Sequence, residues 1–120
     1  MFTRQALPLL FSAMAISAHA AAGSGDQMQQ VMYQCERDIQ LPITYINTAG
    51  GGAYAVMQMD GQQIPMSIAV SASGARYVSI DEQRSYSWHT KNNEGVVSWK
   101  PADETDKPMP LLIECTTSEL

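Results

Sequence analysis

Few side chains in this chain of 120 residues are of the types that carry out catalysis. His89 is the only histidine after position 19, so it has no second histidine with which to bind a metal. Its setting is typical of a partly exposed strand residue. The adjacent acids Asp81 and Glu82 lie in a polar stretch, which is typical of a solvated turn rather than of an acid/base pair. The sequence therefore predicts no enzyme active site, no metal site and no cofactor.

The first twenty residues have the three parts of a secretory signal peptide. Arg4 supplies the positive charge, residues 6–16 the apolar segment, and Ala18 and Ala20 the small residues of a cleavage site. The apolar segment is shorter than the roughly 20 residues that a membrane-spanning helix needs, and there is no cysteine at the cleavage site to carry a lipid anchor. We therefore expect residues 1–20 to be removed and the protein to be free in the periplasm.

The length and charge of the part after the expected cleavage site limit the possible folds and partners. It has 100 residues, enough for one domain. Residues 21–29 are small and polar, which predicts a flexible leader before a single domain over residues 30–120. Six basic against twelve acidic residues leave a formal net charge of −6. Such a surface disfavours nucleic acid and anionic membranes as partners and favours a basic protein.

Cys35 and Cys115 are the only cysteines in the chain. In an oxidising compartment an even number of cysteines predicts a disulfide rather than free thiols or a metal site. A bridge across this separation constrains the unfolded chain by roughly 4 to 5 kcal/mol in the chain-entropy model. That is comparable with the whole net stability of a small domain.

Apolar and polar residues alternate with a period of two, in segments about ten residues apart with turn signals between them. The strongest turn signal is Asp60-Gly61, a hairpin dipeptide. Eight short antiparallel strands predict an up-and-down β-barrel, because closure removes exposed strand edges. A two-sheet sandwich gives the same local pattern. The predicted strands are 31–35, 41–45, 55–59, 64–70, 76–81, 86–90, 95–100 and 109–116.

The alternation also predicts which side of the barrel the cysteines face. Cys35 is in phase with Val31, and Cys115 is in phase with Leu111 and Ile113. Both sulfur atoms should therefore point to the apolar interior, where a bridge would join the first strand to the last. In such a meander the turns at 50–52, 71–74 and 91–94 all follow even-numbered strands, so we expect them to share one rim.

Two of these turns carry a paired motif. The chain resembles the periplasmic and membrane-bound inhibitors of c-type lysozyme, which have S-G-x-x-Y in one turn and an aromatic residue followed by T-K-G in a later one. A Tyr-x-Cys at residues 33–35 and a late cysteine also fit, so the resemblance covers essentially the whole exported chain. The matching positions are Ser73, Gly74, Tyr77, Trp88, Thr90 and Lys91.

The resemblance implies a proteinaceous inhibitor that inserts the Ser73 and Lys91 turns into the cleft of a basic c-type lysozyme. The lysine ammonium would pair with an ionised catalytic carboxylate and the serine hydroxyl with the other carboxyl group. Gly74 would let the backbone approach closely, while Tyr77 and Trp88 would brace the turns from within the barrel.

This sequence departs from the family pattern in two places. Asn92 stands where the family has glycine, and the stretch between Tyr77 and Trp88 is longer. Asparagine tolerates a left-handed turn better than other non-glycine residues, and the extra length falls in a turn at the opposite rim. We therefore expect neither departure to move Lys91.

Two other functions fit parts of the pattern. A lipocalin-like carrier would hold a small apolar ligand inside the barrel, although eight strands leave an interior that side chains normally fill. A structural protein of the cell envelope would have no soluble target. The sequence leaves the oligomeric state, monomer or dimer, open.

Overall fold

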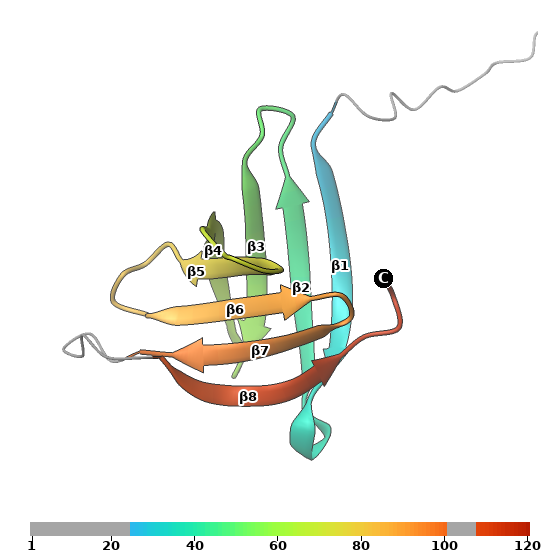
Figure 1. Ribbon diagram of the computed structural model, residues 1–120, viewed down its shortest axis with the longest axis vertical. Helices are drawn as coiled ribbons and strands as arrows, with labels where there is room; N and C mark the ends of the chain where they lie inside the picture. The colour runs from blue at the N-terminus through green and yellow to red at the C-terminus, as the bar shows by residue number, and fades with distance from the viewer. Residues whose placement is uncertain (1–24, 101–107) are drawn as a thin grey trace, which may run out of the picture.

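A computed structural model describes residues 25–100 and 108–120 of the chain. In this part the chain forms a closed antiparallel barrel in which each strand pairs with the next along the sequence, as predicted (Figure 1). No helix within it has the length and apolar character needed to cross a membrane. The strands are β1 (Gln27–Gln34), β2 (Gln40–Asn47), β3 (Ala53–Met59), β4 (Gln62–Ala69), β5 (Ala75–Ser79), β6 (Tyr86–Lys91), β7 (Glu94–Trp99) and β8 (Met109–Thr116), with a short 3-10 turn η1 (Glu36–Asp38) after β1.

The barrel is strongly twisted. Strands β1 to β3 run along the vertical axis of Figure 1, and β5 to β8 cross them. The tightest predicted hairpin is confirmed, because Asp60 and Gly61 have the left-handed φ values of 52° and 72° that a primed turn requires. Met59 and Gln62 pair on either side of this turn.

The interior is filled by inward-facing side chains, with one polar cluster among them. The Tyr33 and Tyr45 hydroxyl oxygens lie 2.8 Å apart, and Trp88 donates from Nε1 to the Tyr45 hydroxyl at 2.8 Å. Burial raises the pKa of Tyr45 well above its ordinary value, so this phenol stays protonated. The side chains with no exposed surface are Val31, Tyr33, Leu41, Ile43, Ala55, Met57, Met66, Trp88, Val97 and Cys115.

The structure corrects the predicted leader. Strand β1 begins at Gln27 and pairs with the end of β2, from Gln27 opposite Asn47 to Gln29 opposite Tyr45. The prediction of a leader over residues 21–29 was therefore wrong for its last three positions. The side chains of residues 27–30 are exposed on both faces, so no apolar alternation marks the strand, and backbone pairing alone defines it. The expected signal peptide lies outside the described residues.

The predicted phase of the last strand was also wrong. Leu112 faces the core, whereas Leu111 and Ile113 are 38% and 39% exposed. Gly95 pairs with Cys115 and Val97 pairs with Leu112. Two residue positions along β7 therefore lie opposite three along β8. A β-bulge accounts for the extra residue, and Cys115 nevertheless faces the interior with no exposed surface.

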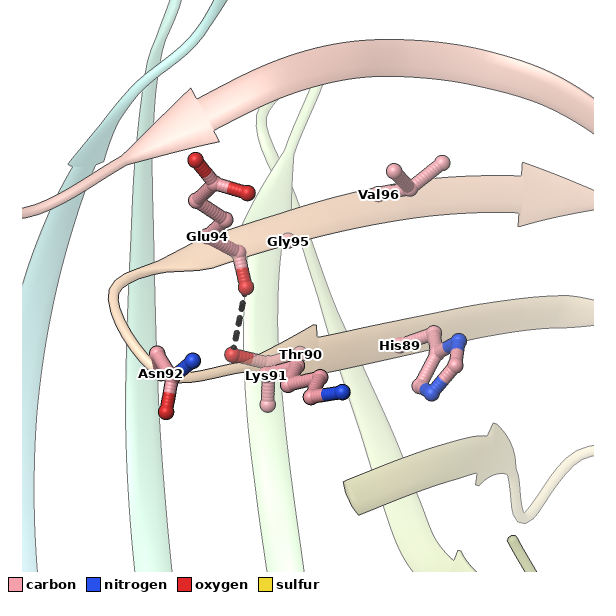
Figure 2. A pocket seen from close by; sticks show the side chains of 7 residues that line it. All are labelled: His89, Thr90, Lys91, Asn92, Glu94, Gly95 and Val96. Carbon is pink, nitrogen blue, oxygen red and sulfur yellow. Dashed lines mark hydrogen bonds between the residues drawn. The ribbon is translucent and has the colours of Figure 1, made fainter. Parts of the chain in front are cut away.

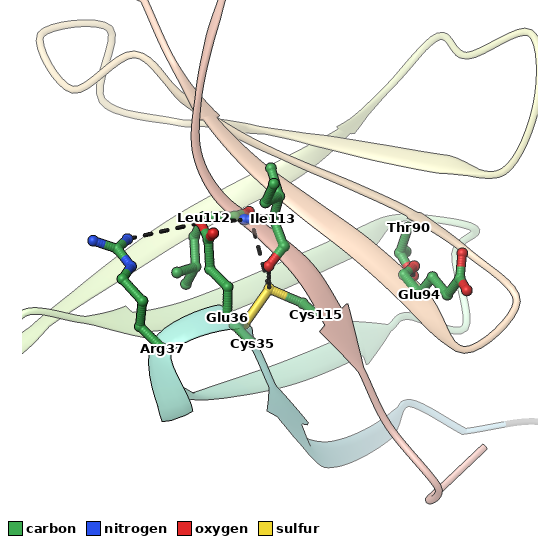
Figure 3. Close-up of a disulfide and its surroundings, with 8 residues drawn as sticks. All are labelled: Cys35, Glu36, Arg37, Thr90, Glu94, Leu112, Ile113 and Cys115. Atoms are coloured by element: carbon green, nitrogen blue, oxygen red, sulfur yellow. Dashed lines mark hydrogen bonds and ion pairs between the residues drawn. A yellow bond between two sulfur atoms is a disulfide. The ribbon is translucent and has the colours of Figure 1, made fainter.

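The predicted disulfide is confirmed, and it lies at the weakest seam of the barrel. Cys35 directly follows β1 and is bonded to Cys115 in β8 (Figure 3). Beside it, β1 and β8 pair at one register position only, Gln34 with Thr116. The covalent bridge therefore joins two strands that share little backbone hydrogen bonding.

Candidate functional site

The turn that carries Ser73 packs directly against the end of β6. Gly74, at the start of β5, has a left-handed φ of 69°. A Cβ atom at this position would collide with the carbonyl oxygen of Thr90 and lie 3.1 Å from the Cβ of Lys91. Only glycine fits both the conformation and the close approach. The β4–β5 and β6–β7 turns are therefore neighbours, as the sequence predicted.

The third turn of the predicted rim lies elsewhere. Residues 48–52, between β2 and β3, project at the top of Figure 1, apart from the β6–β7 turn. The turn is closed on itself, since Thr48 donates from its backbone N–H to the Gly52 carbonyl at 2.8 Å. This turn also follows an even-numbered strand, but β2 and β3 cross the later strands, so it does not lie beside Ser73 and Lys91.

The β6–β7 turn is closed by one contact within the hairpin and by another from the residue that follows β8. Asn92 has a left-handed φ of 54°, which confirms that asparagine adopts the conformation expected where the family has glycine. Thr90 donates from its side-chain hydroxyl to the Glu94 carbonyl at 2.8 Å (Figure 2). The Thr117 backbone N–H donates to the Asn93 carbonyl at 3.0 Å. Lys91 is thus presented by an ordered hairpin.

Lys91 itself is exposed at the end of β6. Figure 2 shows the Lys91 side chain running along the outer side of β6 while Glu94 points the other way. Among the described residues, no carboxylate lies within 4.0 Å of the Lys91 ammonium; the ion pairs there join Arg37 to Glu36 and Arg84 to Asp81. The described residues also contain no cluster of three potential metal ligands. The site therefore offers an exposed cation beside an exposed serine turn.

Tyr77 and Trp88 lie where the sequence placed them, inside the barrel beneath the turns. They are register partners across β5 and β6, and Trp88 has no exposed surface. Gly95, on the neighbouring strand, lies so close to the Trp88 ring that any Cβ there would overlap ring carbons. Sequence reasoning did not single out Gly95, because nothing local distinguishes a residue that must leave room for a ring from another strand.

The longer stretch between Tyr77 and Trp88 lies at the opposite end of β6 from Lys91. Strand β5 ends at Ser79 and β6 begins at Tyr86, so the extra residues form the β5–β6 turn. Figure 1 shows this turn on the left and the β6–β7 turn on the right. The expectation that this stretch lies at the other rim is confirmed.

His89 was not among the predicted site residues and was interpreted as an ordinary strand residue. Its Nε2 atom lies 2.8 Å from the Ser73 carbonyl oxygen. Figure 2 shows His89 and Lys91 on the same side of β6. The available signal was their spacing of two residues on one strand, which places two side chains on one face.

Comparison with known proteins identifies the family. The model of the family described as "Membrane-bound lysozyme-inhibitor of c-type lysozyme" matches residues 33–106, which include both turn motifs. The chain belongs to this family. The resemblance drawn from the two motifs is therefore confirmed.

Two relatives in the lysozyme-inhibitor family match most of the chain. A membrane-bound lysozyme inhibitor of C-type lysozyme from Cupriavidus necator is 32% identical over 105 residues, covering 82% of this chain and 78% of the relative. A protein of the same description from Pseudomonas aeruginosa is 28% identical over 123 residues, covering 86% and 94%. The crystal structure of PliC-St, periplasmic lysozyme inhibitor of C-type lysozyme from Salmonella typhimurium, aligns with a TM-score of 0.66 at 24% identity, over 77% of this chain and 99% of that one. This likeness in structure shows a shared fold.

Proposed function

We propose that this protein inhibits c-type lysozyme by inserting the Ser73 and Lys91 turns into the active-site cleft of the enzyme. The observation that carries the proposal is the contact of Gly74 with Thr90 and Lys91, which places an exposed serine turn beside an exposed lysine. Membership of the inhibitor family supports the choice of partner. The relatives from Cupriavidus necator and Pseudomonas aeruginosa are both described as inhibitors of C-type lysozyme.

The chemistry of the pair suits a glycosidase cleft. A lysozyme of this type keeps one carboxylic acid protonated and a second carboxylate ionised. The Lys91 ammonium would bind the ionised group with a charge-assisted hydrogen bond, and the Ser73 hydroxyl would bond the protonated one. Lys91 breaks no ion pair with a described residue when it enters the cleft. Both catalytic groups would then be unable to act on peptidoglycan.

Charge and location fit the same partner. The exported chain would carry a formal net charge of −6, and the family resemblance implies a basic lysozyme as its target. Opposite net charges accelerate association at low salt. We further propose that the protein acts in the periplasm, because its first twenty residues have the pattern of a signal peptide. There it would meet a lysozyme that attacks the cell wall.

The packed interior argues against the carrier function. Fully buried side chains, Tyr33, Met57, Met66 and Trp88 among them, occupy the interior where a ligand would have to lie. Removing one of them would leave a cavity at a cost of a few kcal/mol, which is typical of a packed core.

Lysozyme inhibition by wild-type protein and by one substitution tests the proposal. Excess purified protein should abolish lysis of a peptidoglycan suspension by a hen-type lysozyme. Truncating one partner of a desolvated charge contact typically costs about 2 to 5 kcal/mol, so Lys91→Ala should raise the inhibition constant by about thirtyfold or more. The thermal midpoint should not change, because Lys91 is exposed.

Lys100→Ala is the matched control. Lys100 follows the far end of β7 and makes its hydrogen bond to Ser85 through the backbone, which alanine retains. We expect its inhibition constant to stay within about twofold of the wild type. Lysis that continues at excess wild-type inhibitor would overturn the proposed function. Equal losses for the two lysine substitutions would remove Lys91 from the contact.

A further inference from the structure

The turn that carries Ser73 has little of its own to hold it in place. The ladder between β5 and β6 ends with Ala75 opposite Thr90, so residues 71–74 lie beyond the last strand pair. Val70, just before the turn, is 94% exposed, and Ser73 is exposed as well. A turn without apolar anchoring gains its order from backbone contacts such as that of Gly74 and from hydrogen bonds, against a cost of about 1 to 2 kcal/mol per residue in backbone entropy.

The His89 side chain reaches this turn from the neighbouring strand β6 and forms a hydrogen bond with it. Its Nε2 lies 2.8 Å from the Ser73 carbonyl oxygen, and a carbonyl can only accept, so Nε2 is the donor. The Ser71 hydroxyl donates to the same oxygen at 2.7 Å. The Ser71 oxygen and His89 Nε2 are 3.5 Å apart, which makes a compact group of three polar atoms.

The position of His89 ties this group to Lys91. His89 is opposite Arg76 in the β5–β6 ladder and two residues before Lys91 on β6. Both side chains lie on the outer side of the strand (Figure 2). The Gly74 contact fixes one end of the serine turn against β6, and the imidazole fixes Ser73 on the face from which Lys91 projects.

We propose that His89 is a positioning residue, which orders the β4–β5 turn so that the Ser73 hydroxyl enters the lysozyme cleft beside Lys91. The inference rests on the proposed function and adds to it a residue that the turn motif does not include. Its physical basis is preorganisation: a turn ordered in the free inhibitor loses less entropy on binding, and more of the contact energy appears as affinity. His89 acts through Ser73 and needs no contact with the enzyme.

Two substitutions separate the hydrogen bond from the ring. His89→Leu keeps a side chain of similar size and removes the donor, whereas His89→Gln keeps an N–H donor on a flexible side chain. A net hydrogen bond contributes about 0.5 to 1.5 kcal/mol, so we expect His89→Leu to raise the inhibition constant by about twofold to tenfold. His89→Gln should recover most of this loss. Both variants should keep the fold, with a thermal midpoint no more than slightly below that of the wild type, because His89 is exposed.

The free protein gives a readout that does not depend on lysozyme. Backbone ¹⁵N relaxation should show lower order parameters for residues 72–74 in His89→Leu than in the wild type, with the β6–β7 turn unchanged as an internal reference. His89→Gln should restore them. Unchanged order parameters in His89→Leu would overturn the inference while leaving the proposed function intact. A wild type that does not inhibit lysozyme would overturn the proposed function, and the relaxation data would still decide whether His89 orders the turn.

A double-mutant cycle with Ser73→Ala tests whether His89 acts through Ser73. If it does, His89→Leu should cost less than twofold in inhibition once the serine hydroxyl is absent, because there is no longer a group to position. The same loss in both backgrounds would mean that the imidazole contacts lysozyme directly, which would contradict a positioning role.

Discussion

Two regions of this barrel are held together in different ways. At the seam, β1 and β8 share one register pair, and the closure depends on the Cys35–Cys115 bridge. Two carboxylates assist it: Glu36 accepts from the Ile113 N–H at 3.2 Å, and Glu119 accepts from the Met32 N–H at 2.8 Å. Figure 3 shows Glu36 beside the disulfide, with a dashed line to Ile113 in β8.

At the two site turns no covalent link is involved. The β6–β7 hairpin has a continuous ladder from Tyr86 opposite Trp99 to Lys91 opposite Glu94, and the serine turn rests on it through Gly74. Close backbone approach and short hydrogen bonds define the geometry there. The contrast teaches that the seam and the site turns are stabilised separately in this fold, so the disulfide should be removable with little effect on binding geometry.

The largest expected effect separates the two regions most clearly. Replacing both Cys35 and Cys115 with serine releases a loop closed over 80 positions. The chain-entropy model gives a loss of about 4 to 5 kcal/mol in the free energy of unfolding, measurable by urea denaturation. The fraction that remains folded should inhibit lysozyme within about twofold of the wild type. A loss of unfolding free energy below about 1 kcal/mol would show that the seam does not depend on the bridge.

A smaller effect should link core packing to the site. In Gly95→Ala the new methyl group must displace the Trp88 ring, which lies under the β6–β7 hairpin. Overpacking of this kind costs typically about 1 to 3 kcal/mol, and it should weaken inhibition too, because the displaced ring supports the strand that carries Lys91. Gly50→Ala is the control, since nothing lies within 4 Å of the added atom. Equal thermal midpoints for the two variants would contradict the packing argument.

The smallest effect concerns the polar contacts of the seam. Glu119→Ala removes an acceptor from the Met32 N–H at an exposed position. In the oxidised protein we expect the free energy of unfolding to change by no more than about 0.5 kcal/mol. In the variant without the disulfide the same substitution should cost more, because the carboxylate is then one of the few links left across the seam. Equal costs in the two backgrounds would show that bridge and carboxylate act independently.

Much of the fold could be predicted because strand alternation and turn chemistry are local properties. The Asp60-Gly61 hairpin and the left-handed Asn92 follow from the backbone preferences of those residues. The cysteine pairing could be predicted because the chain has two cysteines, which allow one pairing. The adjacency of Ser73 and Lys91 followed from meander topology, which brings the β4–β5 and β6–β7 turns to one end of neighbouring strands.

The errors arose where backbone geometry departs from regular alternation. The bulge in β8 shifts the buried positions from Leu111 to Leu112, and no residue in that strand signals it. The first residues of β1 have polar side chains on both faces, so only their pairing with β2 reveals a strand. The third predicted turn failed to join the site because the crossing of β2 and β3 over later strands depends on the twist of the whole sheet.

The sequence by itself determined the eight strands, the disulfide and the two motif turns, since each depends on residue types within a few positions or on a pairing with no rival. Only the tertiary structure decided that Gly95 must lack a side chain beneath Trp88 and that His89 reaches the Ser73 carbonyl. Both contacts join different strands or turns at distances of a few ångströms. Such contacts depend on register and twist, which no local pattern in the chain encodes.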